Sequence, residues 1–170
     1  MALRIYLVGF MGSGKSTWGS VWADVQGWKF IDLDLEIERK YGMSVYQIFH
    51  TRGEHAFRIM EAEMLRATEK FRNAIIACGG GTPCFHQNME WMNEKGYTVF
   101  LKASEDMLFG RLVLEKQQRP LIANIADHDL RQVISLKLKE RAYFYHQSKW
   151  TLDANNLDVD SLNDIVHSAI

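Results

Sequence analysis

The nine residues Gly9 to Thr17 combine glycines, one lysine and two hydroxyl groups at a spacing that can hold phosphate. They read Gly-Phe-Met-Gly-Ser-Gly-Lys-Ser-Thr and fit the pattern G-x-x-x-x-G-K-[ST]. Glycines let such a loop turn its N–H groups inward on an anion, and the helix that follows adds its positive end. Lys15 can reach the β- and γ-phosphates of a nucleotide, and the Ser16 hydroxyl can bind Mg²⁺. The predicted phosphate contacts are Gly12, Ser13, Gly14, Lys15, Ser16 and Thr17.

Two aspartates follow the apolar pair Phe30-Ile31. At the end of a strand, Asp32 and Asp34 would point to the same side, because side chains two apart share a face. One hypothesis makes Asp32 a carboxylate near Mg²⁺ and Asp34 an acceptor for a substrate hydroxyl. The alternative is that either residue caps the helix that follows.

A run of three glycines, Gly79 to Gly81, follows another apolar run. Glycine allows a ligand or a side chain to come close to the backbone, so a ligand contact at Gly80 is one interpretation. A flexible turn ahead of Pro83 is the other.

Four arginines are candidates for anion contacts. Arg58 has Glu54 and Glu61 one helical turn away on either side, so surface ion pairs are its alternative role. Arg141 lies within a long predicted helix. Arg119 precedes Pro120 in a polar segment that is predicted to be a lid, from which an arginine could stabilise charge on a transferring phosphoryl group. Arg111 lies just before that segment.

The elements that must position these residues alternate between short apolar runs and longer amphipathic stretches. This alternation predicts a parallel sheet covered by helices on both faces, and such sheets bind ligands at the carboxyl ends of their strands. Trp18, Trp22 and Trp28 are expected in the core. The predicted strands are 3–8, 28–31, 74–77, 97–101 and 150–152, and the predicted helices are 15–25, 33–41, 44–51, 53–70, 86–94, 104–114, 128–147 and 159–169.

Composition limits the function classes. The chain has 170 residues, a formal charge of −1 and 47% hydrophobic residues, which predicts one globular domain over residues 1–170. The near-neutral charge argues against general nucleic-acid binding. No apolar run reaches the ~20 residues of a membrane span. Two cysteines, Cys78 and Cys84, cannot form a disulfide framework, so we expect a cytoplasmic protein.

Taken together, these motifs resemble the shikimate kinase family over nearly the whole chain. The resemblance rests on the phosphate loop, the two aspartates, the glycine run and the order in which they occur. It also includes Ile48-Phe49, Gly53-Glu54, Phe57-Arg58, Glu61, Arg119-Pro120-Leu121, Arg141 and Tyr145.

The resemblance implies a P-loop kinase fold, with a five-stranded parallel sheet in the order 2-3-1-4-5, a substrate-binding segment near 33–61 and a lid near 113–126. It implies transfer of a phosphoryl group from ATP to the 3-hydroxyl of shikimate, within aromatic amino-acid biosynthesis, by a monomer. By position, Lys15, Asp34 and Arg119 would be catalytic and Arg111 would flank the adenine. Asp34, Arg58, Gly80 and Arg141 would hold shikimate, and Ser16 and Asp32 would serve Mg²⁺.

Two other functions stay open at this point. A related P-loop kinase, such as a gluconate kinase, would share the phosphate loop and the lid. A nucleotide-binding switch without enzyme activity would need only the loop. The sequence also departs from the family: Thr82-Pro83-Cys84 follows the glycines where small apolar residues are usual, and the residues near 149–155 match no adenine contact clearly.

Overall fold

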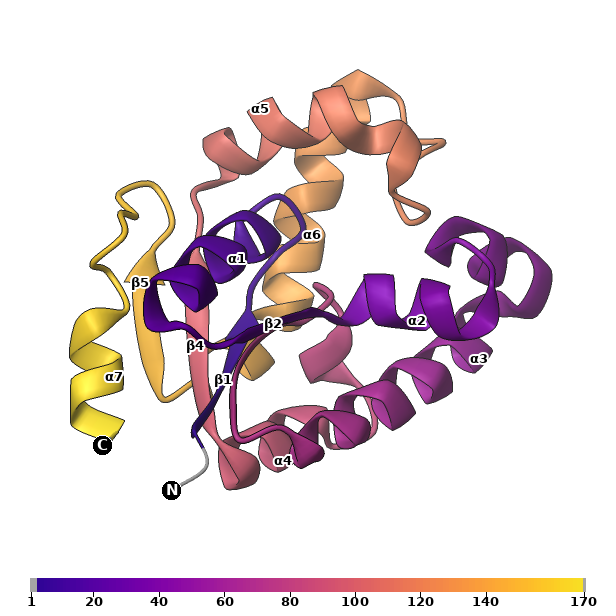
Figure 1. Ribbon diagram of the computed structural model, residues 1–170. Coiled ribbons are helices and arrows are strands. Elements are labelled where there is room, and N and C mark those ends of the chain that lie inside the picture. Colours follow the sequence, from indigo (N-terminus) through magenta and orange to yellow (C-terminus); the bar gives the residue numbers. More distant parts are fainter. Residues whose placement is uncertain (1–2, 170) are drawn as a thin grey trace.

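Five short apolar runs form one parallel sheet in the computed structural model, which describes residues 3–169 (Figure 1). The sheet order is β2-β3-β1-β4-β5, and every neighbouring pair is parallel. The predicted fold class and strand order are therefore confirmed. The strands are β1 Leu3–Val8, β2 Lys29–Asp32, β3 Asn73–Ala77, β4 Tyr97–Lys102 and β5 Trp150–Asp153.

The described residues form seven α-helices that pack around the sheet. They are α1 Lys15–Gln26, α2 Leu33–Tyr41, α3 Val45–Ala67, α4 Asn88–Lys95, α5 Glu105–Glu115, α6 Asp127–Tyr145 and α7 Asn163–Ala169. The longest, α3, has 23 residues, and the shortest, α7, has seven. Short 3₁₀ turns lie at Thr68–Lys70 (η1), Thr82–Cys84 (η2) and Lys116–Gln118 (η3).

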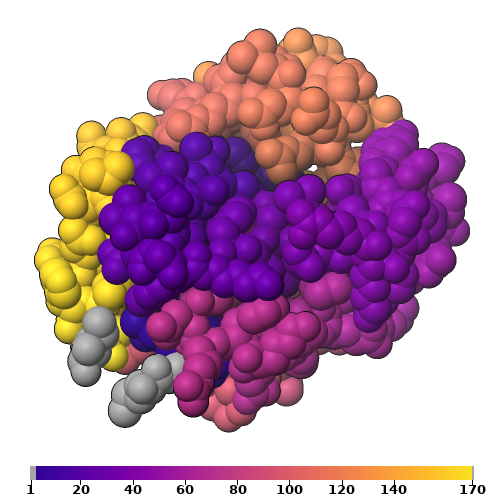
Figure 2. Space-filling model, in the orientation of Figure 1, coloured from indigo at the N-terminus to yellow at the C-terminus, as the bar shows by residue number. Residues whose placement is uncertain are grey.

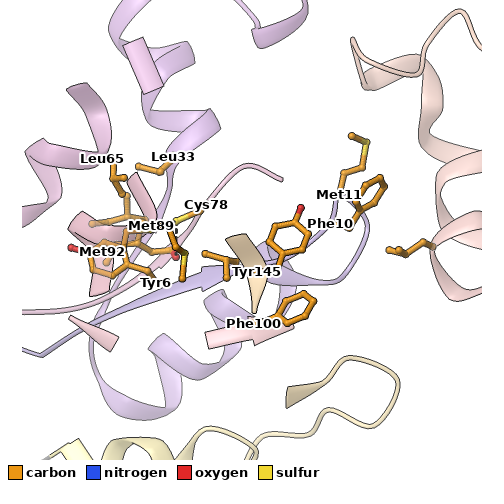
Figure 3. Packing of buried hydrophobic residues seen from close by; sticks show 14 of the residues in the cluster. Tyr6, Phe10, Met11, Leu33, Leu65, Cys78, Met89, Met92, Phe100 and Tyr145 are labelled. Atoms are coloured by element: carbon orange, nitrogen blue, oxygen red, sulfur yellow. Dashed lines mark hydrogen bonds between the residues drawn. The ribbon is translucent and has the colours of Figure 1, made fainter. Parts of the chain in front are cut away.

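Alternate side chains of the central strand β1 build two separate cores. Ile5 and Leu7 pack with Trp22 of α1 and with the α7 helix on one face. Tyr6 and Val8 point to the opposite face, where α3, α4, α5 and α6 contribute the rest of a second core (Figure 3). Because strand side chains alternate in direction, one six-residue strand holds helices on both faces of the sheet.

Two helix boundaries differ from the sequence prediction. The helices predicted at 44–51 and 53–70 form the single element α3, which changes direction at Gly53, where the backbone is non-helical with φ 83° and ψ 167°. The last helix begins at Asn163 rather than at residue 159. Side-chain hydrogen bonds, including one from the Ser161 hydroxyl to Asp158, hold the preceding residues in turns.

The carboxyl end of the sheet lies beneath two opposing segments. The segment between α5 and α6 faces the turn between α2 and α3 across this end (Figure 1). The surface between them is hollowed (Figure 2). The strands, their loops and these two segments therefore converge on one place.

Candidate active site

The loop between β1 and α1 surrounds a buried lysine. Lys15 is 7% exposed, and its Nζ donates hydrogen bonds of 2.8 Å to the backbone oxygens of Gly9 and Phe10. Burial, followed by the nearby Arg119 charge, lowers the pKa of Lys15 to about 8. The loop therefore keeps a cationic ammonium group at its centre, where a phosphate oxygen could replace a carbonyl as its acceptor.

A cavity of about 300 Å³ opens above this loop. Arg111 borders it and donates from Nη1 to the backbone oxygen of Gly12 at 2.7 Å. Arg119 borders it from the predicted lid and pairs with Glu115 at 3.1 Å. Its lining includes the predicted residues Gly12, Gly14, Lys15, Ser16, Thr17, Asp32, Asp34, Gly80, Arg111 and Arg119. Ser13 is fully buried and does not line the cavity.

Asp32 uses its two carboxylate oxygens for two tasks. Its Oδ1 accepts from the backbone N–H groups of Asp34 and Leu35 at 3.1 and 3.3 Å, and so caps α2. Its Oδ2 accepts a hydrogen bond of 2.5 Å from the Ser16 hydroxyl. The helix cap is thus confirmed, and it leaves the second carboxylate oxygen facing the phosphate loop, so capping does not exclude a metal contact.

Asp34 is a carboxylate in an unfavourable position. Its Oδ1 is shielded from solvent and has no hydrogen-bond partner within the described chain. Burial, followed by the charges of Glu61 and Asp32, raises its pKa to about 7. A buried acceptor without a donor is costly, so this oxygen is available to a hydrogen-bond donor from a ligand.

Arg58 is buried rather than held in surface ion pairs. It is 4% exposed, and three of its N–H groups donate to the carboxylates of Glu54 and Glu61. A guanidinium has five N–H donors, so one remains on each terminal nitrogen. These two N–H groups are available to an anion such as a carboxylate.

A second arginine, Arg141, reaches the same place from α6. It is 7% exposed, and its Nη1 has no hydrogen-bond partner in the described part of the chain. A Cβ added to Gly80 would lie 3.0 Å from this nitrogen. The Tyr145 hydroxyl donates to the backbone oxygen of Gly80 at 2.6 Å and fixes the turn. A buried guanidinium with a free N–H group is costly, so this nitrogen is available to an anionic ligand.

The two arginines line a smaller cavity that joins the first one. Its charged lining consists of three arginines and two carboxylates, and its apolar lining comes from Met11, α3 and the predicted lid; the charged residues are Arg58, Arg119, Arg141, Asp34 and Glu61. The residues common to both cavities are Met11, Asp34, Gly79, Gly80 and Arg119. Asp34 and Arg119 therefore stand between the cavity above the phosphate loop and the cavity lined by the two arginines.

The structure gives three side chains at this site a burial or a position that the sequence does not predict. Glu61 belongs to the motif behind the family resemblance, but its expected contact with Arg58 is a surface ion pair; in the structure it is fully buried and pairs with Arg58 at 3.0 Å. Thr82 is also fully buried and donates to Glu61. Trp18 packs on the core as expected but also lines the nucleotide-sized cavity. Helical spacing placed Glu61 near Arg58, but nothing in the sequence showed that both are buried.

The fold and the joined cavities define a phosphoryl-transfer enzyme of the P-loop class. The family model for shikimate kinase matches residues 11–169. The chain belongs to the shikimate kinase family and is an ATP-dependent kinase, as the sequence predicts.

Individual relatives agree with this assignment. The shikimate kinase of Phocaeicola vulgatus is 44% identical over 155 residues, which are 91% of this chain and 89% of that protein. The structure of shikimate kinase from Bacteroides thetaiotaomicron superposes with a TM-score of 0.88 at 41% identity, over 99% of this chain and 96% of the other. The Acinetobacter baumannii enzyme in complex with shikimate gives a TM-score of 0.88 at 31% identity, covering 99% and 93%.

The raised pKa of Asp34 has a consequence for stability. A carboxyl whose pKa is near 7 when folded and 3.8 when unfolded destabilises the fold increasingly as pH rises between these values. Asp34→Asn is therefore expected to raise Tm by about 5 °C at pH 8 and by less at pH 5.5. Thermal melts in EDTA at both pH values test this, and a Tm gain that does not shrink at pH 5.5 would contradict it.

Proposed function

We propose that the enzyme transfers the γ-phosphoryl group of ATP to the 3-hydroxyl of shikimate, giving shikimate 3-phosphate and ADP. The observation that carries this proposal is the pair of buried arginines, Arg58 and Arg141, with N–H groups left free in one cavity. Shikimate carries one carboxylate and several ring hydroxyls. A bidentate contact from Arg58 and a second contact from Arg141 would hold the carboxylate, and the Gly80 backbone would contact the ring.

Asp34 would receive the hydroxyls at the other end of the substrate. Its unpartnered Oδ1 lies where the two cavities join, so a hydroxyl bound there would face the phosphate loop. With a pKa of about 7, Asp34 is partly ionised near neutral pH and suited to take the proton from the 3-hydroxyl.

Lys15 and Arg119 would stabilise the transferring group. Phosphoryl transfer depends mainly on positioning and on stabilising charge spread over the phosphate oxygens. Lys15 approaches from the loop below, and Arg119 approaches from the predicted lid above. Arg111, beside the loop, would flank the adenine, and the backbone of residues 12–17 would hold the phosphates.

The donor set beside the loop fits Mg²⁺. This ion prefers oxygen ligands and usually binds to one or two carboxylates plus substrate phosphates. Ser16 Oγ and Asp32 Oδ2, which lie 2.5 Å apart, offer a hydroxyl and a carboxylate for that purpose. When bound, Mg²⁺ would neutralise charge on the phosphates.

The variant Asp32→Asn separates Mg²⁺ binding by Asp32 from its capping of helix α2. Asparagine caps helices about as well as aspartate, so Tm is expected to stay nearly unchanged. Loss of the charge is expected to raise the Mg²⁺ concentration at half-maximal activity about tenfold. A Mg²⁺ titration of turnover at fixed ATP measures this, and an unchanged curve would leave Asp32 as a helix cap only.

The segments around the cavity would form two moving parts. We place the substrate-binding segment at about 33–61 and the lid at about 113–126. Closure of the lid would exclude water, which would otherwise accept the phosphoryl group.

Each chain contributes all the residues invoked here, which supports a monomer. Both cysteines are free, which supports a cytoplasmic location. No helix in residues 3–169 is long and apolar enough to cross a membrane.

The substrate assignment is tested by measuring the ADP formed from ATP, in the presence of Mg²⁺, with different acceptors. We expect release with shikimate and only background release with gluconate, a nucleoside monophosphate or no acceptor. Release with gluconate alone would keep the kinase class but remove the shikimate assignment, because gluconate also carries a carboxylate that the two arginines could bind. Nucleotide binding without release in any arm would favour a switch.

A further inference from the structure

We propose that Thr82 is a positioning residue for substrate binding: its hydroxyl fixes the Glu61 carboxylate, which in turn sets the orientation of Arg58. The inference rests on the proposed function, since it assigns Arg58 to the substrate carboxylate. Thr82 begins the segment in which this chain departs from the usual family pattern after the glycines.

The contact is a short hydrogen bond between fully buried groups. Thr82 and Glu61 are both 0% exposed, and the Thr82 hydroxyl donates to Glu61 Oε2 at 2.6 Å. Hydroxyl-to-carboxylate bonds of 2.5–2.7 Å are the charge-assisted kind. The other oxygen, Glu61 Oε1, accepts from Arg58 Nη1 at 3.0 Å. One carboxylate thus joins the threonine to the arginine.

The threonine itself is held rigidly. Its backbone N–H donates to the Gly79 oxygen at 3.1 Å, and its backbone oxygen accepts from the Asn88 side chain at 2.8 Å. Asn88 is fully buried and also accepts a hydrogen bond from Arg66 of α3. The backbone of Thr82 is therefore held by the turn η2 and, through Asn88, by α4 and α3.

Little room exists for another arrangement of Glu61. A Cβ placed on Gly79 would lie 2.9 Å from Glu61 Oε2, 3.1 Å from the Thr82 hydroxyl and 3.4 Å from Asp34 Oδ1. The carboxylates of Glu61 and Asp34 therefore meet around one glycine, and they repel each other. The Thr82 proton holds Glu61 Oε2 against that repulsion, with Oε1 left facing Arg58.

The orientation of the Arg58 guanidinium depends in turn on Glu61. A Cβ on Gly81 would lie 2.5 Å from Arg58 Nη2, so the guanidinium rests directly on the backbone there. Glu54 is 46% exposed and binds the outer edge of the guanidinium, whereas Glu61 binds the inner edge. If Glu61 rotates, Arg58 loses the partner of its inner edge and the guanidinium can turn, which weakens its contact with a substrate carboxylate.

Thr82→Val tests the proposal, because valine has the same shape without the donor. We expect KM for shikimate to rise about tenfold, with KM for ATP within twofold of wild type. Thr82→Ser, which restores the hydroxyl, should return KM for shikimate to within about threefold. The matched control is Thr98→Val, since Thr98 of β4 is also fully buried and donates a 2.6 Å hydrogen bond, to Asn93 of α4.

A double-mutant cycle separates positioning from packing. If Thr82 acts through Glu61, Thr82→Val should change KM for shikimate less than twofold in a Glu61→Ala background. Thr82→Ala, measured by shikimate binding, replaces Thr82→Val if that variant does not fold. An unchanged shikimate KM, equal rises for both substrates, or the same loss in Thr98→Val would overturn the proposal. Absence of shikimate-dependent turnover in the wild type would instead overturn the proposed function.

Discussion

Lys15→Ala is expected to lower kcat by about a thousandfold or more, while the fold remains intact. Charge-stabilising groups at a transferring phosphoryl group are worth roughly this much, because they act most strongly when charge spreads in the transition state. The Lys15 ammonium lies 2.8 Å from two oxygens at the centre of the phosphate-binding loop, where alanine would leave no cation. Steady-state kinetics with saturating shikimate and ATP measure the effect.

A matched control is the exposed Lys139→Ala on α6, which should leave kcat within twofold. Circular dichroism and a melting curve should show that Lys15→Ala is folded. A Lys15→Ala enzyme with kcat within tenfold of wild type would mean that the loop binds phosphate without contributing to transfer.

The second large effect is expected from Arg141→Met. KM for shikimate should rise about a hundredfold or more, because a desolvated contact between guanidinium and carboxylate is lost. The fold should be no less stable, since Nη1 of this buried guanidinium has no partner in the described chain. A rise in Tm together with a rise in shikimate KM is the expected combination.

Arg58→Met provides the contrast. It should also weaken shikimate binding, but it should lower Tm, because it leaves the buried Glu61 carboxylate without its partner. KM for ATP should change little in either variant. Equal losses of affinity for ATP and shikimate would show that neither arginine is specific for the substrate carboxylate.

The fold was predictable because its signals are local. The alternation in β1 and the glycine-lysine loop after it depend on neighbouring residues only, and the order of strands follows from that loop and the family resemblance. The boundary of α7 was less predictable, because turns between residues 158 and 163 depend on side-chain hydrogen bonds that periodicity does not encode.

The sequence predicts which residues form the site better than it predicts their burial and their hydrogen-bond partners. The expected residues meet around two joined cavities, but the sequence left Arg58 open as a surface residue. Its burial depends on α3 packing against the glycine turn, a contact between residues more than 20 positions apart. Thr82 and Glu61 became visible as partners only through the same packing.

The most direct test of the account compares shikimate with its methyl ester as acceptors in the wild type and in Arg141→Met. The wild type should lose about a hundredfold or more in kcat/KM on the ester, because the ester removes the charge that the two arginines bind. The ratio of kcat/KM for shikimate to kcat/KM for the ester should be at least tenfold smaller in Arg141→Met, since one of the two arginine contacts is already absent. An ester that is turned over as well as shikimate, or a ratio equal in both enzymes, would contradict the carboxylate clamp.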